Sequence, residues 1–170
     1  MSTLRWRPSV TVAAVIAALV DGETRYLLVE EHTPEGLKLN NPAGHLDPAE
    51  SPEQAVVREA LEETGRVFTP EALVGVYLSR FQRPARGEDV TYLRLAFAGS
   101  VGEADPARRL DEGIVGTLWM SLPELRAATA RLRSPLVLRC VEDHAAGVRH
   151  PLGLMVTDPS IYAPEIKPGR

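Results

Sequence analysis

The chain has 170 residues, 44% of them hydrophobic and 25% charged, a length and composition typical of one folded domain rather than a disordered segment. Its formal net charge of −4 gives no general attraction to nucleic acid or to an anionic membrane, so neither is expected as a partner. The single cysteine, Cys140, excludes an internal disulfide framework and any zinc site built from several thiolates, which favours a reducing, cytoplasmic setting.

The first apolar run, residues 10–20, is expected to be a buried strand. Because Arg5 and Arg7 precede it, the run superficially resembles a secretory signal sequence. It is too short for a membrane-spanning helix, which needs about 20 residues, and its β-branched side chains favour a strand. The dipeptide Asp21-Gly22 then predicts a tight hairpin turn into a second strand at residues 26–30.

A helix is expected at residues 51–64, because the sequence carries start and stop signals at both ends. Ser51 is a good N-cap, Pro52 fits the first helical position, and Gln54 completes a capping box. Gly65 is the expected stop. Before this helix, residues 32–41 are expected to be a polar connection, and the Pro42-Ala43-Gly44 sequence argues against a continuous helix or a central strand.

The remaining elements follow the same patterns. They are strands at 73–81, 90–98 and 114–120, a polar loop at 82–89, helices at 122–131 and 135–146, and an irregular, proline-rich tail at 151–170. Strands that flank an internal helix, with helices at the end, predict an α/β fold with a mixed sheet and helices on its faces. We expect one domain over residues 1–170, with its core at about 9–150.

Three carboxylates gather near the end of the predicted helix. At about 100° per residue, Glu59, Glu62 and Glu63 fall within one sector about 100° wide. Like charges at this spacing are unfavourable, and the helix dipole disfavours anions at a C-terminus. Either the face is simply solvated or a cation compensates it. An all-oxygen cluster selects a hard ion such as Mg²⁺ or Mn²⁺, which commonly bridges to substrate phosphates.

The spacing of this segment favours the second interpretation. It fits the pattern G-x5-E-x7-R-E-U-x-E-E-x-G, with fixed positions at Gly44, Glu50, Arg58, Glu59, Ala60, Glu62, Glu63 and Gly65. The segment resembles the signature of the Nudix hydrolases, pyrophosphohydrolases that act on a nucleoside diphosphate linked to another group. It departs from that signature at Arg66, where relatives usually carry an aliphatic residue, and at Ala43, where many have glycine. Neither change removes a carboxylate.

The resemblance implies a fold and a site. The fold would be an α/β/α sandwich around a central mixed sheet, with the signature forming a loop, a helix and a loop. The expected ligands of Mg²⁺, or of Mn²⁺, are the Gly44 carbonyl and the carboxylates of Glu59, Glu62 and Glu63. Glu59 is also a candidate base. The resemblance implies that Arg58 holds the signature carboxylates in place and that Glu50 stabilises the loop.

Other candidate residues lie outside the signature. A further catalytic carboxylate is expected in the loop before the last strand, with Glu112 as first choice and Asp111 as second. The planar guanidinium group of arginine matches the geometry of a phosphate. Three arginines are therefore either substrate contacts or surface and structural residues. The expected substrate-binding residues are Arg80, Arg94, Arg133 and His45.

Runs such as 10–13, 28–31, 41–46 and 132–137 extend the resemblance to the bacterial NudJ-type phosphatase subgroup. This similarity implies an Mg²⁺-dependent hydrolase of nucleoside di- and triphosphates or of small pyrophosphates such as hydroxymethylpyrimidine pyrophosphate. Two alternatives remain open: a pyrophosphatase acting on ADP-ribose or oxidised nucleotides, and a nucleotide-sensing module without catalytic activity. The expected partner is a small phosphorylated molecule, and the chain could be a monomer or a homodimer.

Overall fold

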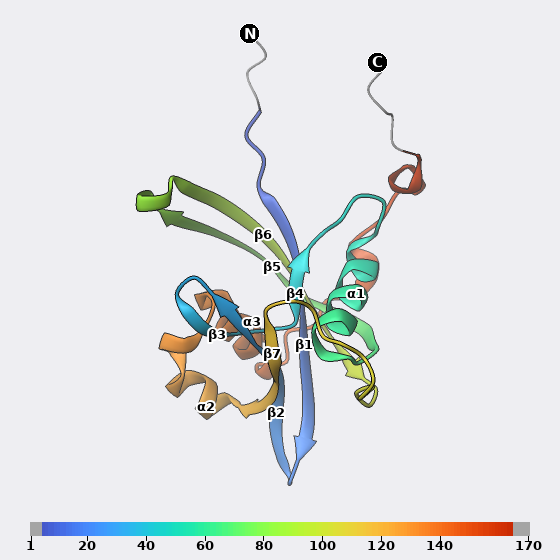
Figure 1. The fold of residues 1–170 in the computed structure, drawn as a ribbon. Coiled ribbons are helices and arrows are strands. Elements are labelled where there is room, and N and C mark those ends of the chain that lie inside the picture. Colours follow the sequence, from blue (N-terminus) through green and yellow to red (C-terminus); the bar gives the residue numbers. More distant parts are fainter. Residues whose placement is uncertain (1–4, 165–170) are drawn as a thin grey trace.

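The long strand β1, Ser9–Val20, is the centre of a mixed sheet (Figure 1). The structure is a computed structural model that describes residues 5–164. The other strands in this range are β2 (Glu23–Thr33), β3 (Gly36–Asn40), β4 (Ala43–His45), β5 (Phe68–Arg83), β6 (Glu88–Val101) and β7 (Ile114–Ser121). The main strand order is β3-β2-β1-β6-β5, with β4 also paired to β1 and β7 to β2. Only the β1–β6 pair among these described strands is parallel.

The two halves of β1 have different neighbours. Its first half pairs with β6 on one side and, over residues 11–13, with β4 on the other, whereas residues 17–20 pair with β2. The two hairpins, β2–β3 and β5–β6, therefore extend from β1 in different directions (Figure 1). The short strand β4 is placed between them, beside the helix that carries the predicted carboxylates.

The helices cover opposite faces of the sheet. The first helix, α1 (Pro52–Thr64), packs on the face that carries Val12, Ala14 and Ile16. The helices α2 (Leu122–Ala127) and α3 (Pro135–Ala145) pack on the other face. Figure 1 shows this α/β/α layering, with α1 on one side of β1 and α3 on the other. The alternation of β1 side chains between two apolar cores explains why this strand is an almost continuous hydrophobic run.

Several sequence-based expectations are confirmed. Asp21 and Gly22 both have positive φ angles, 51° and 80°, in the hairpin turn between β1 and β2. The α1 helix begins with the expected capping box at Ser51 and ends at Gly65, whose φ is 66°. The predicted loop at 82–89 is much shorter than expected, because β5 and β6 continue to a single 3-10 turn at Pro84–Arg86.

Two predictions about the segment before α1 were wrong. The expected polar connection at 32–41 contains β3, whose residues Gly36–Asn40 pair with β2. The residues after Pro42 form the short strand β4, although a strand was not expected there. Proline is tolerated because it lies just outside the strand and its carbonyl still accepts a hydrogen bond from the Ala14 N–H. The predicted helix at 122–131 divides into α2 and a 3-10 turn.

The C-terminal segment lies along the surface. It contains the 3-10 turns Leu152–Leu154 and Pro159–Tyr162, and the last six residues of the expected tail lie outside the described residues. The Tyr162 hydroxyl donates to the side chain of Gln54 on α1. Within residues 5–164, no helix has both the length and the apolar character needed to cross a membrane.

Candidate active site

The helix α1 positions the predicted carboxylates because one of its faces is apolar. Ala55, Val56 and Ala60 are completely buried against the sheet. Glu59 and Glu63 follow the edge of this buried face, and each is only 8% exposed. Burial of two carboxylates is costly unless their oxygens have partners, so the helix must place them against polar groups.

The Glu59 carboxylate lies directly against the backbone of Gly44 on β4. A Cβ atom added to Gly44 would come within 2.1 Å of the Glu59 side chain. No other residue than glycine fits this position without displacing the carboxylate. The signature glycine is therefore a packing requirement, because it lets the Glu59 carboxylate approach the backbone of β4.

Glu63 is tied to the same strand. Its Oε2 atom accepts a hydrogen bond from the backbone N–H of Ala43 at 2.8 Å. Burial, together with the nearby carboxylates of Glu59, Glu31 and Asp111, raises the pKa of Glu63 to about 8, and the Ala43 hydrogen bond opposes the rise. Burial likewise raises the pKa of Glu59. Both groups lie in a strongly negative environment.

Arg58 organises the rest of the cluster. Its Nε and Nη2 atoms donate to the two oxygens of Glu50 at 3.0 and 2.7 Å. Its Nη1 atom donates to Glu59 at 2.7 Å and to Glu62 at 3.0 Å, and Nη2 also reaches the His45 carbonyl at 2.9 Å. One guanidinium thus joins the helix to the loop before it. Glu50 also accepts from the Asp47 N–H, which agrees with the expected loop-stabilising role.

The charges of this cluster do not balance. Arg58 supplies one positive charge to Glu50, Glu59 and Glu62, while Glu63 has only a backbone N–H as its partner. Arg58 holds the Glu59 and Glu62 carboxylates, and no three acidic, histidine or cysteine side chains in residues 5–164 converge as a ready-made metal site. The excess of oxygen donors and the close approach to Gly44 nevertheless fit a hard divalent cation.

The loop before β7 contributes through Asp111. The Asp111 N–H donates to the Glu62 carbonyl at the end of α1 at 3.0 Å. The Asp111 carboxylate is near enough to raise the pKa of both Glu59 and Glu63. Glu112, the first choice from the sequence, is exposed, and no hydrogen bond or ion pair joins it to α1 in the described structure.

The predicted substrate-binding residues are spread over several places. His45 lies on β4 beside the cluster, with its ring centroid 6.3 Å from that of Tyr92. Arg133 lies 3.6 Å from Glu31, a group that faces Glu63. Arg80 is far along the β5–β6 hairpin, where Asp89 accepts from it at 2.8 and 2.6 Å. An arginine neutralised in this way is less available to a substrate.

Arg94 on β6 is buried on the sheet face opposite α1. It is 8% exposed, and its Nη1 atom has no hydrogen-bond partner. In the register of the sheet, Arg94 lies beside Thr11, which in turn lies beside His45. The sheet therefore connects Arg94 to the candidate site through one intervening strand.

Glu31 is a member of the site that the sequence analysis missed. It lies on β2 where a bulge shifts the pairing with β7, and such bulges redirect side chains. Its carboxylate is near enough to raise the pKa of Glu63, accepts from Asn40 at 3.3 Å and pairs with Arg133. The available signal was a pair of acidic residues, Glu30 and Glu31, directly after an apolar strand.

Comparison with known proteins agrees with this geometry. A family model described as the NUDIX domain matches residues 10–139. Phosphatase NudJ of Escherichia coli strain K12 is 33% identical over 150 residues, which cover 88% of this chain and 92% of that protein. This chain belongs to the Nudix hydrolase family. Within that family it is a pyrophosphohydrolase or phosphatase of acid anhydrides in phosphorus-containing substrates.

Solved structures of Nudix proteins confirm the α/β/α fold. A NUDIX hydrolase from Nitrosomonas europaea is 49% identical, with a TM-score of 0.78 and coverage of 89% of this chain and 98% of that one. The Nudix domain of Shewanella oneidensis NrtR, solved with ADP ribose, is 20% identical, with a TM-score of 0.64 and coverage of 84% and 89%. At that identity, the second likeness shows the fold alone.

Proposed function

We propose that this Nudix protein is an Mg²⁺-dependent hydrolase, with Mn²⁺ as a possible substitute. Its substrates would carry phosphoanhydride bonds and include nucleoside di- and triphosphates or small pyrophosphates such as hydroxymethylpyrimidine pyrophosphate. The observation that carries this proposal is the placement of Glu59 and Glu63 against β4, where Gly44 and Ala43 hold them. The similarity to Phosphatase NudJ supports the substrate class.

The residues that would hold the metal are Glu59, Glu62, Glu63 and the Gly44 carbonyl. A divalent cation bound there supplies charge neutralisation for the phosphates and a more acidic water. The protein itself contributes the positions of these carboxylates. Arg58 hydrogen-bonds to two of the carboxylates and the Ala43 N–H to the third, which keeps all three beside β4, and their oxygens would turn toward a common ion when the cation binds.

The surrounding residues have supporting roles in this proposal. Asp111 and Glu31 increase the negative charge around Glu63, which strengthens attraction to a cation. Asp111 therefore fits the role of the further carboxylate better than Glu112 does. Arg133, at the edge of the site beside Glu31, and His45 on β4 are the proposed contacts of the substrate near the reacting phosphates. The fully buried Cys140 fits a reducing cytoplasm.

The test is a panel of phosphorylated metabolites assayed for phosphate and pyrophosphate release with and without Mg²⁺. Glu59→Gln and Glu63→Gln should each lower turnover by about 100-fold or more, because each removes a charge that binds the cation. Glu103→Gln is a matched control, since Glu103 is exposed and makes no ion pair within the described residues. Full Mg²⁺-dependent activity in both site variants would contradict the assignment.

The products distinguish this proposal from its alternatives. Inorganic phosphate from nucleoside diphosphates supports the phosphatase interpretation, whereas AMP together with a sugar phosphate indicates a pyrophosphatase of ADP-ribose. Nucleotide binding without turnover, even at high Mg²⁺, would indicate a sensing module. The buried carboxylates favour the catalytic interpretation, because a module that only binds a nucleotide has no need to bury Glu59 and Glu63 against β4.

A further inference from the structure

A row of four side chains crosses the sheet on the face opposite α1. Paired residues in adjacent strands point to the same face, so the register places His45, Thr11, Arg94 and Tyr77 side by side. The row begins on β4, next to Gly44, and ends on the edge strand β5. It therefore starts on the residue after Gly44 and leads away from β4.

Two members of this row are buried, and each has one polar atom without a hydrogen-bond partner. Arg94 and Thr11 are each 8% exposed, and neither the Arg94 Nη1 nor the Thr11 Oγ1 atom has a hydrogen-bond partner. Arg94 forms no ion pair with any residue in the range 5–164. A guanidinium cannot lose its charge, so a buried one without an anion is costly. Proteins commonly retain such an unfavourable free energy at functional sites, where a bound ligand supplies the missing partner.

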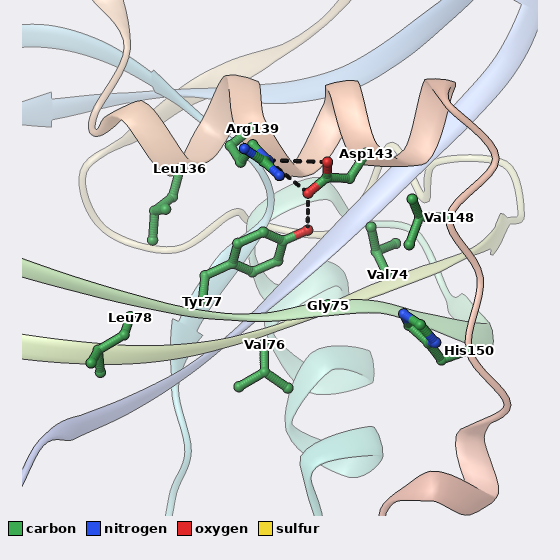
Figure 2. Close-up of a pocket in the computed structure, with 10 residues that line it drawn as sticks. All are labelled: Val74, Gly75, Val76, Tyr77, Leu78, Leu136, Arg139, Asp143, Val148 and His150. Atoms are coloured by element: carbon green, nitrogen blue, oxygen red, sulfur yellow. Dashed lines mark hydrogen bonds and ion pairs between the residues drawn. The ribbon is translucent and has the colours of Figure 1, made fainter.

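The neighbours of Arg94 cannot supply the missing negative charge. Figure 2 shows the Tyr77 hydroxyl directed at Asp143 on α3, with Arg139 beside the same carboxylate. Asp143 accepts from Tyr77 at 2.9 Å and pairs with Arg139, so both of its oxygens are engaged. Burial raises the pKa of the nearby Cys140 thiol to about 11, partly offset by Arg94, so this thiol stays neutral.

The two ends of the row have different surroundings. At one end, the Tyr77 hydroxyl donates a hydrogen bond to Asp143, and toward the other end Thr11 lies between Arg94 and His45. Two strand spacings separate His45 from Arg94, a distance of about 10 Å. A group that binds Arg94 would thus belong to the part of a substrate that is not cleaved.

We propose that Arg94 and Thr11 form a subsite for a second phosphate group, carried by the substrate about 10 Å from the phosphoanhydride bond that is cleaved. This inference rests on the proposed function. It narrows the substrate class to nucleotides or related pyrophosphates with an additional phosphate at the non-reacting end. The guanidinium supplies the charge and the Thr11 hydroxyl supplies a further donor.

Binding can be tested without catalysis. Inorganic phosphate is titrated into the full chain in metal-free buffer, and affinity is measured by calorimetry. Arg94→Met should weaken phosphate binding at least about tenfold, and Thr11→Val should weaken it about threefold, because charged hydrogen bonds contribute more than neutral ones. Arg86→Met is the control, since Arg86 lies exposed at the tip of the β5–β6 hairpin.

The melting temperature gives a second readout that separates binding from structure. Both variants remove an unpartnered buried polar atom, so without phosphate each should melt at the same temperature as the parent or higher. A lower melting temperature with unchanged phosphate affinity would show that Arg94 is structural and would overturn the proposal. Thr11→Val keeps the β-branched shape and carries the test if Arg94→Met does not fold.

Kinetics then test the substrate class. ADP is compared with the same nucleotide bearing an additional 2′- or 3′-phosphate. The parent should prefer the additional phosphate by about tenfold or more in kcat/KM, and Arg94→Met should abolish this preference through KM. An equal kcat/KM for both substrates would refute the subsite. Absence of all hydrolysis, with Arg94-dependent phosphate binding intact, would instead refute the proposed function.

Discussion

The Glu63 carboxylate on α1 accepts a hydrogen bond from the backbone N–H of Ala43 on β4 at 2.8 Å. The other edge of β4 pairs with β1, so this N–H is left for a partner outside the sheet. The C-terminal end of α1 is therefore fixed to β4 by the Ala43 N–H, which forms no hydrogen bond within the sheet. The position of the proposed metal-binding carboxylates relative to Gly44 depends on this one short strand.

Gly44→Ala should inactivate the protein while leaving it folded. The new methyl group would overlap the Glu59 carboxylate, which must move away from the loop. A displacement of about 1 Å at a reacting centre can lower turnover about 100-fold. Turnover and melting temperature are measured together, with Gly153→Ala as control because a Cβ there meets no neighbouring atom. Unchanged turnover would show that Glu59 need not hold this position.

Arg58→Lys should weaken the response to Mg²⁺. Lysine keeps the charge, but a single ammonium cannot span Glu50, Glu59 and Glu62 as the planar fork does. Loss of a group that orients ligands typically costs about 10- to 100-fold in metal affinity or activity. The Mg²⁺ concentration for half-maximal turnover reports the effect. Arg139→Lys, on the exposed face of α3, should leave it unchanged; an equal shift in both variants would speak against positioning by Arg58.

Asp111→Asn and Glu112→Gln separate two neighbouring acids. The Asp111 carboxylate is near enough to raise the pKa of Glu59 and Glu63, so its neutralisation should reduce Mg²⁺-dependent turnover about tenfold. Glu112→Gln should change turnover by less than about twofold, since surface substitutions away from such networks have small effects. The Mg²⁺ dependence of kcat, measured for both variants, shows which of the two acids supports turnover. The reverse ranking would assign the role to Glu112.

Stability should fall in acid because His144 on α3 is buried. Burial, followed by the charge of Arg149, lowers the pKa of His144 from 6.5 to about 4, and its Nδ1 atom meets the Tyr26 hydroxyl at 3.2 Å. The unfolded chain binds a proton below about pH 6.5 and the folded chain only near pH 4, so the free energy of unfolding decreases between these values.

Urea unfolding at pH 7.5 and pH 5 measures this effect. His144→Gln should show a smaller loss of stability over that interval than the parent, because its side chain takes up no proton. His32→Gln serves as the control, since His32 is exposed on β2. An identical loss in the parent and in His144→Gln would exclude His144 as the source of the acid sensitivity.

Local sequence signals predicted the elements that are bounded by characteristic turn or helix-capping residues. The Asp21-Gly22 turn and the capping box at Ser51 each depend on residues close together in the sequence, and both are confirmed. The strand β3 was missed because its apolar residues are few, and β4 because Pro42 and Gly44 normally interrupt strands. Both strands exist because a neighbouring strand offers hydrogen bonds, a condition that local sequence does not reveal.

The sequence alone determined the kind of chemistry. The spacing of Glu59, Glu62 and Glu63 is a helix-period property, so one turn of the helix already places the three acids together. Only the tertiary structure decided what surrounds them. Glu31, beside a β-bulge, is near enough to raise the pKa of Glu63, and Arg94 lies two strands from His45 without an ion pair among the described residues. Sheet register sets these relationships, because it joins residues distant in the chain through backbone hydrogen bonds that no local pattern encodes.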